Sequence, residues 1–257
     1  MDAERNIIHF VGAGPGDPEL ITVKGRRLLE AADLVVYAGS LVPQALVADL
    51  RAEIVSSAPL DLGQIIDVMA AAWRQGRKVV RLHTGDPSLY GAIREQMEEL
   101  DRLAIPHAVV PGVSSAFAAA AALEAELTLP EVSQTVIITR LAGRTPVPAG
   151  QELVGLASHR ATMLIFLSVG MIDEVVAELL AGGYPASTPV AVVEKASWPE
   201  ERIIRASLAE IGARVRAAAI RKTAIICVGE VFGDQGLAAV SRLYDRAFAH
   251  GCRDGAD

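Results

Sequence analysis

The feature that most constrains the fold is a regular alternation of short apolar runs with longer amphipathic segments along the 257 residues. The short runs hold four or five apolar residues, end near glycine or proline, and predict buried strands. The longer segments carry apolar residues at helical spacing, as at Leu62, Ile65 and Met69, and predict helices packed on a sheet. Strand–helix alternation is typical of α/β domains, so we expect that fold class.

The predicted elements form two groups. In the first group the strands are Ile7–Val11, Leu34–Tyr37, Lys78–Leu82 and His107–Val110, and the helices are Thr22–Ala32, Leu62–Gln75, Leu89–Leu103 and Ser114–Glu124. In the second group the strands are Thr135–Thr139, Met163–Leu167, Val190–Glu194 and Thr223–Val228, and the helices are Ile172–Ala181 and Ser207–Arg216. Glu201–Arg205 predicts an extra strand in an antiparallel hairpin. We expect two α/β domains, residues 1–126 and 127–257, with a cleft between them.

Composition and charge argue against several functional classes. The net charge of −7 disfavours nucleic-acid binding, which needs a basic face, but allows a local basic cluster for a small anion. Cys227 and Cys252 are too few for a disulfide framework, and the five histidines include no i, i+4 pair, so we expect no metal site. The nearly apolar stretch Ala161–Ile172 is shorter than the about 20 residues that span a bilayer. We expect a cytoplasmic protein without membrane contact.

A glycine-rich loop, Gly12–Pro18, follows the first predicted strand and has the general form of a phosphate-binding loop. Its spacing is G-x-G-x-G rather than G-x-G-x-x-G, and Pro15 and Pro18 lack the N–H groups that would hold a phosphate. The acid that would bind a ribose is also missing after the second strand, where Tyr37–Leu41 stands. We therefore expect a tight turn that needs small residues, or a loop that lines a substrate cleft.

Two further loops follow predicted strands of the same domain, His83–Gly91 and Pro111–Ser115. Taken singly, Asp86 and Ser114 are more often helix caps than ligand-binding groups. All three loops nevertheless lie at carboxyl ends of strands, the edge where such sheets bind ligands. They contain no nucleophile beside a base, no carboxylate pair and no G-x-S-x-G motif, and no catalytic residue stands out. The sequence predicts a site that holds and orients a ligand.

At this point the chain resembles a known family, the tetrapyrrole methylases. The matching segments are Val11–Lys24 (VGAGPGDPELITVK), Arg81–Gly91 (RLHTGDPSLYG), Pro111–Ser115 (PGVSS) and Thr223–Gly229 (TAIICVG). They stand in the family's order and spacing over nearly the whole chain, although any one alone would be a weak signal. Three segments resemble one member more than its siblings that methylate other ring positions: Tyr37–Val42, Glu126–Arg140 and Gly143–Pro148.

The resemblance implies transfer of a methyl group from S-adenosylmethionine to a ring carbon of a reduced tetrapyrrole, leaving S-adenosylhomocysteine. It implies a kidney-shaped homodimer of two-domain chains, with the cofactor in the cleft between the domains. Carried over by motif, the implied cofactor contacts are Pro15, Thr84, Gly85, Asp86, Leu89, Ser114 and Ser115 in the first domain, and Leu167, Ala196, Thr223 and Ala224 in the second.

An anionic tetrapyrrole substrate requires cations in its site. Arg144, within the glycine- and proline-rich loop Gly143–Gly150 that we expect to be mobile, is the first candidate, followed by Lys24 and Arg94. For each of these side chains a solvated surface charge is an equally good interpretation.

Competing interpretations stay open at this level. A sibling enzyme acting on another ring carbon is the nearest, and more distant relatives methylate ribosomal RNA or a modified histidine. A binding protein with a vestigial cleft is disfavoured by the intact loops. A NAD-linked oxidoreductase is disfavoured by the missing acid after the second strand.

Overall fold

The computed structural model describes residues 7–233, 246–249 and 251–253. The chain divides into two compact units. Unit 1 comprises Met1–Ala118 with Ser197–Glu200, and unit 2 comprises Ala119–Ala196 with Glu201–Asp257. The four residues Ser197–Glu200 therefore group with unit 1, although they connect two strands of unit 2. The domain boundary between residues 126 and 127 stays a prediction, which limited proteolysis would test.

Unit 1 contains a five-stranded parallel sheet in the order β3-β2-β4-β1-β5. Its strands are β1 (Ile8–Gly12), β2 (Leu34–Tyr37), β3 (Glu53–Ser56), β4 (Val79–His83) and β5 (His107–Val110). Because all five strands are parallel, their carboxyl ends lie at one edge of the sheet. In this order β4, β1 and β5 are neighbours, and the three loops of interest follow these strands.

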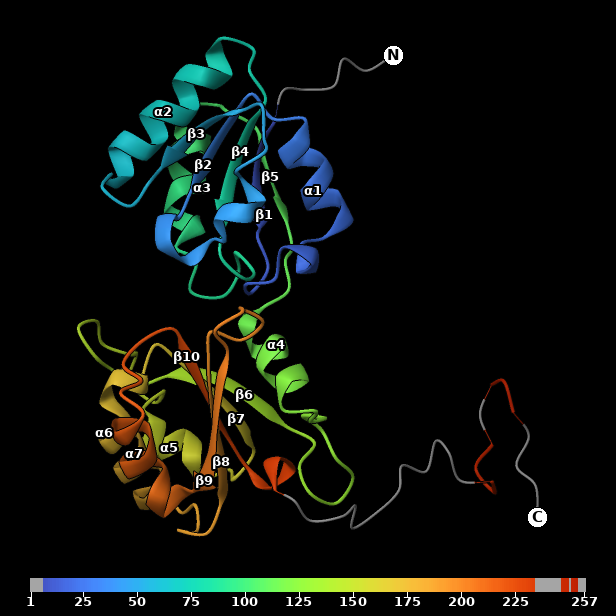
Figure 1. Cartoon of the computed structure of the whole chain (residues 1–257), viewed down its shortest axis with the longest axis vertical. Coiled ribbons are helices and arrows are strands. Elements are labelled where there is room, and N and C mark those ends of the chain that lie inside the picture. Colours follow the sequence, from blue (N-terminus) through green and yellow to red (C-terminus); the bar gives the residue numbers. More distant parts are fainter. Residues whose placement is uncertain (1–6, 234–245, 250, 254–257) are drawn as a thin grey trace. The chain divides into compact units, whose positions relative to one another are not determined.

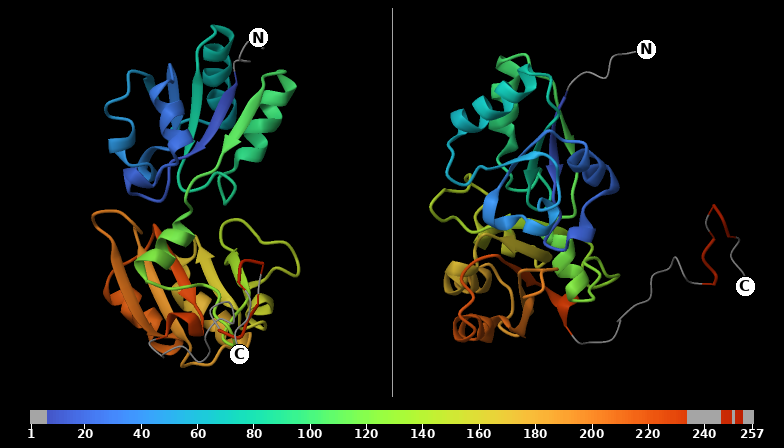
Figure 2. Two further views of the ribbon diagram at one scale, coloured as in Figure 1. Left: turned by 90° about the vertical axis from the view of Figure 1, so that its right-hand side faces the viewer. Right: turned by 45° about the horizontal axis from the view of Figure 1, so that its top comes forward.

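Helices cover both faces of this sheet, as Figures 1 and 2 show. These helices are α1 (Val23–Glu30), α2 (Leu62–Arg74) and α3 (Ile93–Arg102). Helix α4 (Ser115–Ala122) follows β5, and its residues are divided between the two units. Alternate residues of β1 point to opposite faces: Phe10 packs in a cluster with residues of α2 and α3, and Val11 packs with Leu29 of α1. Apolar residues on both faces explain why the strands are almost wholly apolar in sequence.

Unit 2 contains a mixed sheet in the order β6-β7-β10-β8-β9. Its strands are β6 (Val136–Arg140), β7 (Thr162–Phe166), β8 (Pro189–Glu194), β9 (Arg202–Ser207) and β10 (Ala224–Val228). Only β6 and β7 pair in parallel, and the antiparallel β8–β9 hairpin confirms the prediction made for Glu201–Arg205. One core cluster joins this sheet to α5 (Leu153–Ala157), α6 (Ile172–Ala181) and α7 (Leu208–Ala217).

The structure corrects the sequence prediction at three elements. The helix predicted from Leu89 begins only at Ile93, because Tyr90 and Ala92 adopt left-handed conformations with φ of 56° and 48°. Strand β3 was not expected, since it lies at the edge of the sheet, begins with Glu53 and is at most half-buried. The five-residue helix α5 is too short to give a periodic signal.

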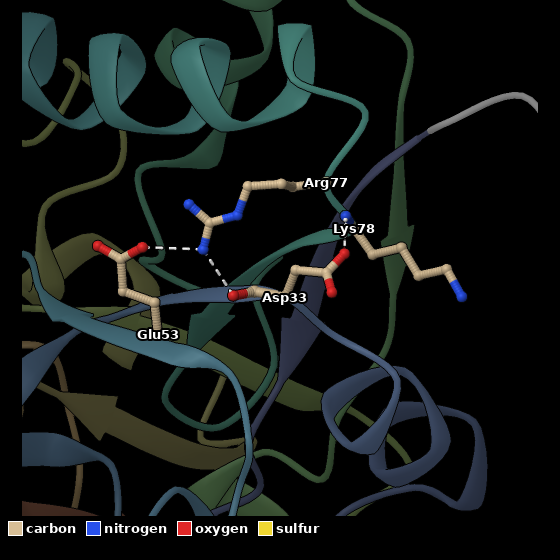
Figure 3. Close-up of polar contacts among 4 residues, drawn as sticks. All are labelled: Asp33, Glu53, Arg77 and Lys78. Atoms are coloured by element: carbon tan, nitrogen blue, oxygen red, sulfur yellow. Dashed lines mark hydrogen bonds and ion pairs between the residues drawn. The ribbon is translucent and has the colours of Figure 1, made fainter.

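The amino edge of the first sheet is closed by polar contacts (Figure 3). One guanidinium nitrogen of Arg77 donates to the carbonyl oxygen of Asp33 and to the carboxylate of Glu53, both at 2.8 Å. The backbone N–H of Lys78 donates to the Asp33 carboxylate at 2.7 Å. These contacts join the starts of β2, β3 and β4, so this edge serves to hold strands together and the opposite edge carries the loops.

None of the helices formed by the described residues combines the length and the apolar character needed to cross a membrane.

Candidate functional site

The loops after β1 and β4 are joined by backbone hydrogen bonds at the carboxyl edge of the first sheet. The N–H of Ala13 donates to the His83 carbonyl oxygen at 2.7 Å. Gly14 and Gly85 exchange two bonds, with N–H to O distances of 2.8 and 3.3 Å. The first and second loops therefore form one backbone surface.

Three glycines bring the third loop against this surface. A Cβ atom placed on Gly12 would lie 2.5 Å from the Cα of Gly112 and 2.7 Å from the carbonyl oxygen of Gly85. A Cβ on Gly112 would overlap the same carbonyl oxygen. Backbone thus packs on backbone, and Gly12 and Gly112 are required by contact distance. This geometry agrees with the expected tight turn.

Asp86 links the second loop to the third. One carboxylate oxygen accepts a hydrogen bond from the N–H of Gly112 at 2.9 Å, and the other accepts from the N–H of Ser88 at 2.8 Å. Because α3 begins only at Ile93, Asp86 is not a cap of that helix. Ser114 does act as expected of a cap: its buried hydroxyl accepts from the N–H of Ala116 at 3.2 Å.

Backbone N–H groups of the first loop are already hydrogen-bonded within the protein. The N–H groups of Ala13 and Gly14 bond to the second loop, and the N–H of Asp17 donates to the hydroxyl of Ser197 at 3.0 Å. Pro15 and Pro18 have no N–H to give. A loop with so few remaining donors cannot cradle a phosphate as a dinucleotide-binding loop does, which supports the interpretation drawn from its spacing.

Trp198 completes the packing of this loop, and sequence reasoning missed it. Its indole N–H donates to the carbonyl oxygen of Pro15 at 2.8 Å. A Cβ on Gly16 would overlap the indole ring, so glycine is required there by contact with Trp198. Pro15 and Trp198 are 183 residues apart, and no local sequence pattern predicts a contact between them.

Gly85, unlike Gly12 and Gly112, has open space at the position of its missing side chain. Its φ is 59°, and a Cβ built on it would meet only Ser115 N, Ser114 Cα and Val113 O, at 3.8 to 4.0 Å. The absent side chain therefore leaves space in front of the third loop, where backbone and ligand can approach. Thr84, Leu89 and Ser115, each partly exposed, are the other residues expected to contact a ligand there. These residues would offer hydroxyl, backbone and apolar groups to a ligand.

In unit 2 the other expected contacts share one edge of the second sheet. Strand β10 runs antiparallel to β7 and β8, so its start lies beside their carboxyl ends. Leu167, Lys195 and Thr223 at this edge all have left-handed backbones, with φ between 49° and 55°. Such strain clusters at ligand sites. Leu167 is also 70% exposed, unusual for a leucine.

The remaining residues at this edge contribute less side chain. Ala196 is buried, so only its backbone is left for a ligand, and Ala224 begins β10 beside Glu194. The N–H of Lys195 donates to the carbonyl oxygen of Thr223 at 2.8 Å, which fixes the strained residues to one another.

The three candidate cations are exposed and belong to separate elements. Lys24 lies on α1, and Arg94 on α3 donates to Glu98 at 2.8 Å. Arg144 stands in a loop that folds around Arg140, whose guanidinium donates to the carbonyl oxygens of Leu141, Thr145 and Pro146 at 3.3, 3.1 and 2.7 Å. These hydrogen bonds give the loop an internal scaffold that was not predicted from the sequence.

Comparisons with known proteins bear on what these loops do. The sequence model of the family described as Tetrapyrrole (Corrin/Porphyrin) Methylases matches residues 7–212. The chain is 57% identical to a cobalt-precorrin-4 C(11)-methyltransferase of Methanocaldococcus jannaschii, over 97% of this chain and 96% of that one. It is 51% identical to a precorrin-4 C(11)-methyltransferase of Pseudomonas aeruginosa, over 96% and 99%.

Solved structures of methyltransferases are also similar to this chain. A cobalt precorrin-4 methyltransferase described as a cobalamin biosynthetic enzyme superposes with a TM-score of 0.87 at 47% identity, covering 89% of this chain and 97% of that one. A uroporphyrin-III C-methyltransferase of Thermus thermophilus, complexed with S-adenosyl homocysteine, superposes with a TM-score of 0.76 at 31% identity, covering 92% and 99%.

Proposed function

The chain belongs to the tetrapyrrole (corrin/porphyrin) methylase family, and from this premise we propose that it transfers a methyl group from S-adenosylmethionine to carbon 11 of precorrin-4, giving precorrin-5 in cobalamin (vitamin B12) biosynthesis. The observation that carries the proposal is 51 to 57% identity, over nearly the full chain, to relatives named for this reaction.

The second candidate substrate is cobalt-precorrin-4. The relative at 57% identity is named for the cobalt-bearing compound and the relative at 51% for the metal-free one, so identity favours neither clearly. Methylation at another position is less favoured, because a uroporphyrinogen-III C-methyltransferase of Pseudomonas aeruginosa is only 34% identical.

When bound, S-adenosylmethionine supplies a methyl group on a positively charged sulfur, already activated for displacement by a nucleophilic ring carbon. The chain itself is left with binding, alignment and exclusion of water, and alignment alone can contribute about 7–11 kcal/mol to lowering a barrier. This division of labour agrees with the three loops, which present hydroxyl, backbone and apolar groups and contain no nucleophile–base pair.

In unit 1 the residues proposed to hold the cofactor are Pro15, Thr84, Gly85, Asp86, Leu89, Ser114 and Ser115. Gly85 supplies space, and Thr84 and Ser115 supply hydroxyl groups beside it. Asp86 acts mainly through the loops, because both of its carboxylate oxygens already accept backbone hydrogen bonds. In unit 2 the proposed contacts are Leu167, Ala196, Thr223 and Ala224, supported by the strained backbone at that sheet edge.

Arg144 is proposed to bind substrate carboxylates, with Lys24 and Arg94 as further candidates. A single exposed arginine gives specificity through its planar, bidentate guanidinium. The scaffold that Arg140 provides keeps the loop of Arg144 folded, which lowers the entropy lost when a substrate is held. We also propose a cytoplasmic homodimer, a state that light scattering of the purified protein would test.

Calorimetric titration with S-adenosylhomocysteine tests the cofactor assignment, with NAD titrated in parallel. We expect micromolar or tighter binding of S-adenosylhomocysteine and none of NAD. Asp86→Ala should abolish or strongly weaken binding, whereas Asp67→Ala, an exposed change on α2, should leave it unchanged. Binding of NAD, or of neither ligand, would refute the proposed function.

A further inference from the structure

The strand that leads into the second loop carries a buried arginine, Arg81. Arg81 on β4 is only 4% exposed, and Gln96 on α3 only 5%. The guanidinium of Arg81 donates from Nε to Oε1 of Gln96 at 2.9 Å and from Nη1 to the carbonyl oxygen of Val36 at 3.2 Å. Both acceptors are neutral, and burial of a charge opposite neutral groups is costly. A costly group that is kept near a candidate site indicates a role beyond packing.

The orientation of the Gln96 amide follows from this contact. A guanidinium can only donate, so the Gln96 atom facing Arg81 must be the oxygen. The amide nitrogen then faces the other way, where it donates to the carbonyl oxygen of Ala92 at 3.0 Å. Gln96 thus joins the buried cation on β4 to the residue that directly precedes α3.

That residue belongs to a strained turn at the end of the second loop. Tyr90 and Ala92 have left-handed backbones, and Gly91 packs so tightly that a Cβ there would overlap the carbonyl oxygen of Pro87. Backbone strain of this kind persists only where surrounding contacts enforce it. The turn connects Leu89, a proposed cofactor contact, to α3 and leaves Tyr90 44% exposed.

We propose that Arg81 and Gln96 are positioning residues for the second loop. Arg81 orients the amide of Gln96, and this amide holds the Tyr90–Ala92 turn, and with it Leu89, in the conformation that binds the S-adenosyl ligand. Neither side chain touches the ligand. The inference rests on the proposed function for its ligand, but the hold on the turn is a property of the protein alone.

Two substitutions separate positioning from stability. Gln96→Glu keeps an oxygen facing Arg81, adds an opposite charge and removes the donor to Ala92. Arg81→Met removes the buried charge and frees the amide of Gln96, but it also leaves Oε1 of Gln96 and the carbonyl oxygen of Val36 without this donor, so some loss of stability is expected in this variant. For both variants we expect the dissociation constant of S-adenosylhomocysteine to rise about 2- to 10-fold, the effect of one lost hydrogen bond. In Gln96→Glu, where the new carboxylate faces Arg81, the unfolding midpoint in urea should not fall.

Gln64→Glu is the matched control. It makes the same chemical change on α2, where Oε1 of Gln64 accepts from the N–H of Asp61 at 3.0 Å and a carboxylate can accept equally well. Binding and stability should both stay at wild-type values in this variant.

Hydrogen exchange of the ligand-free protein provides the second readout. We expect faster exchange in residues 87–95 of Gln96→Glu and Arg81→Met, and no change there in Gln64→Glu. Wild-type exchange and wild-type affinity in both variants would overturn the inference, as would an affinity loss in Gln96→Glu that is accompanied by a lowered unfolding midpoint. If the wild-type protein failed to bind S-adenosylhomocysteine, the proposed function would fall, while the exchange result would still decide whether Arg81 and Gln96 hold the turn.

Discussion

Gly12→Ala is the sharpest test of the way the three loops pack. The added Cβ would lie 2.5 Å from Gly112 Cα, 2.6 Å from Gly112 N and 2.7 Å from Gly85 O, whereas ordinary contacts begin near 3.4 Å. All three atoms are backbone, so no side chain can rotate away. The first and third loops would have to separate, and this would strain the bonds from Gly14 to Gly85 and from Gly112 to Asp86.

The size of the effect follows from these contacts. Overpacking costs typically about 1–3 kcal/mol, and each weakened hydrogen bond adds about 0.5–1.5 kcal/mol. We expect the free energy of unfolding to fall by about 3 kcal/mol, which corresponds to roughly 6–12 °C in melting temperature for a domain of this size. Affinity for S-adenosylhomocysteine should fall as well, because the third loop would move away from the first and second loops.

Urea unfolding followed by circular dichroism measures this change, and Gly155→Ala is its control. Gly155 lies in α5 with open space around its Cβ position, so alanine there should stabilise the protein by about 0.5–1 kcal/mol. A Gly12→Ala protein whose stability lies within 1 kcal/mol of wild type would contradict the backbone contact among Gly12, Gly85 and Gly112.

Three further predictions test separate parts of the molecule. Gly16→Ala should destabilise by about 1–3 kcal/mol in the wild type but little in a Trp198→Leu background, and additive effects in a double-mutant cycle would refute their contact. Burial and the charge of Arg81 lower the pKa of His83 to about 3, from 6.5 in the unfolded chain. As pH falls, the unfolded state therefore binds the proton first, and stability is lost between pH 6.5 and 3. That loss is about 2 kcal/mol at pH 5 and should be missing in His83→Gln; equal slopes of stability against pH in the two proteins would contradict it. Arg144→Ala should raise KM for the tetrapyrrole about 3- to 30-fold without changing affinity for S-adenosylhomocysteine, Lys222→Ala serving as the exposed control; an unchanged KM would exclude Arg144 from substrate binding.

Most of the fold could be predicted because the inner strands of both sheets are largely buried and therefore apolar. Leu34–Tyr37 is a mostly buried apolar run after Asp33, and His107–Val110 is an edge strand delimited by Pro106 and Pro111. The ends of both strands in the structure agree with the prediction. The β8–β9 hairpin was also confirmed. Strand β3 was not predicted because its four residues at the edge of the sheet begin with Glu53 and end with Ser56, which leaves only two apolar residues as a signal. The start of α3 was predicted wrongly because the sequence does not indicate that residues other than glycine, here Tyr90 and Ala92, adopt left-handed conformations.

The site could be predicted only as far as local motifs reach. Each loop follows a strand, and the parallel sheet brings the loops after β1, β4 and β5 to one edge. What holds them there depends on contacts between distant residues, which spacing does not reveal. Trp198 packs on Gly16, the Asp86 carboxylate binds the N–H of Gly112, and Arg81 is buried behind the second loop. The residues expected to contact the cofactor stay predictions.

Transfer of a labelled methyl group tests the central claim most directly. The purified protein would be incubated with S-adenosylmethionine carrying a ¹³C-methyl group and with precorrin-4, and in parallel with its cobalt-bearing counterpart, and the product examined by NMR. We predict one new methyl signal per turnover, attached to ring carbon 11, with formation of S-adenosylhomocysteine. A methyl group on another ring carbon, or no transfer to either substrate by a protein that binds S-adenosylhomocysteine, would contradict the proposed function.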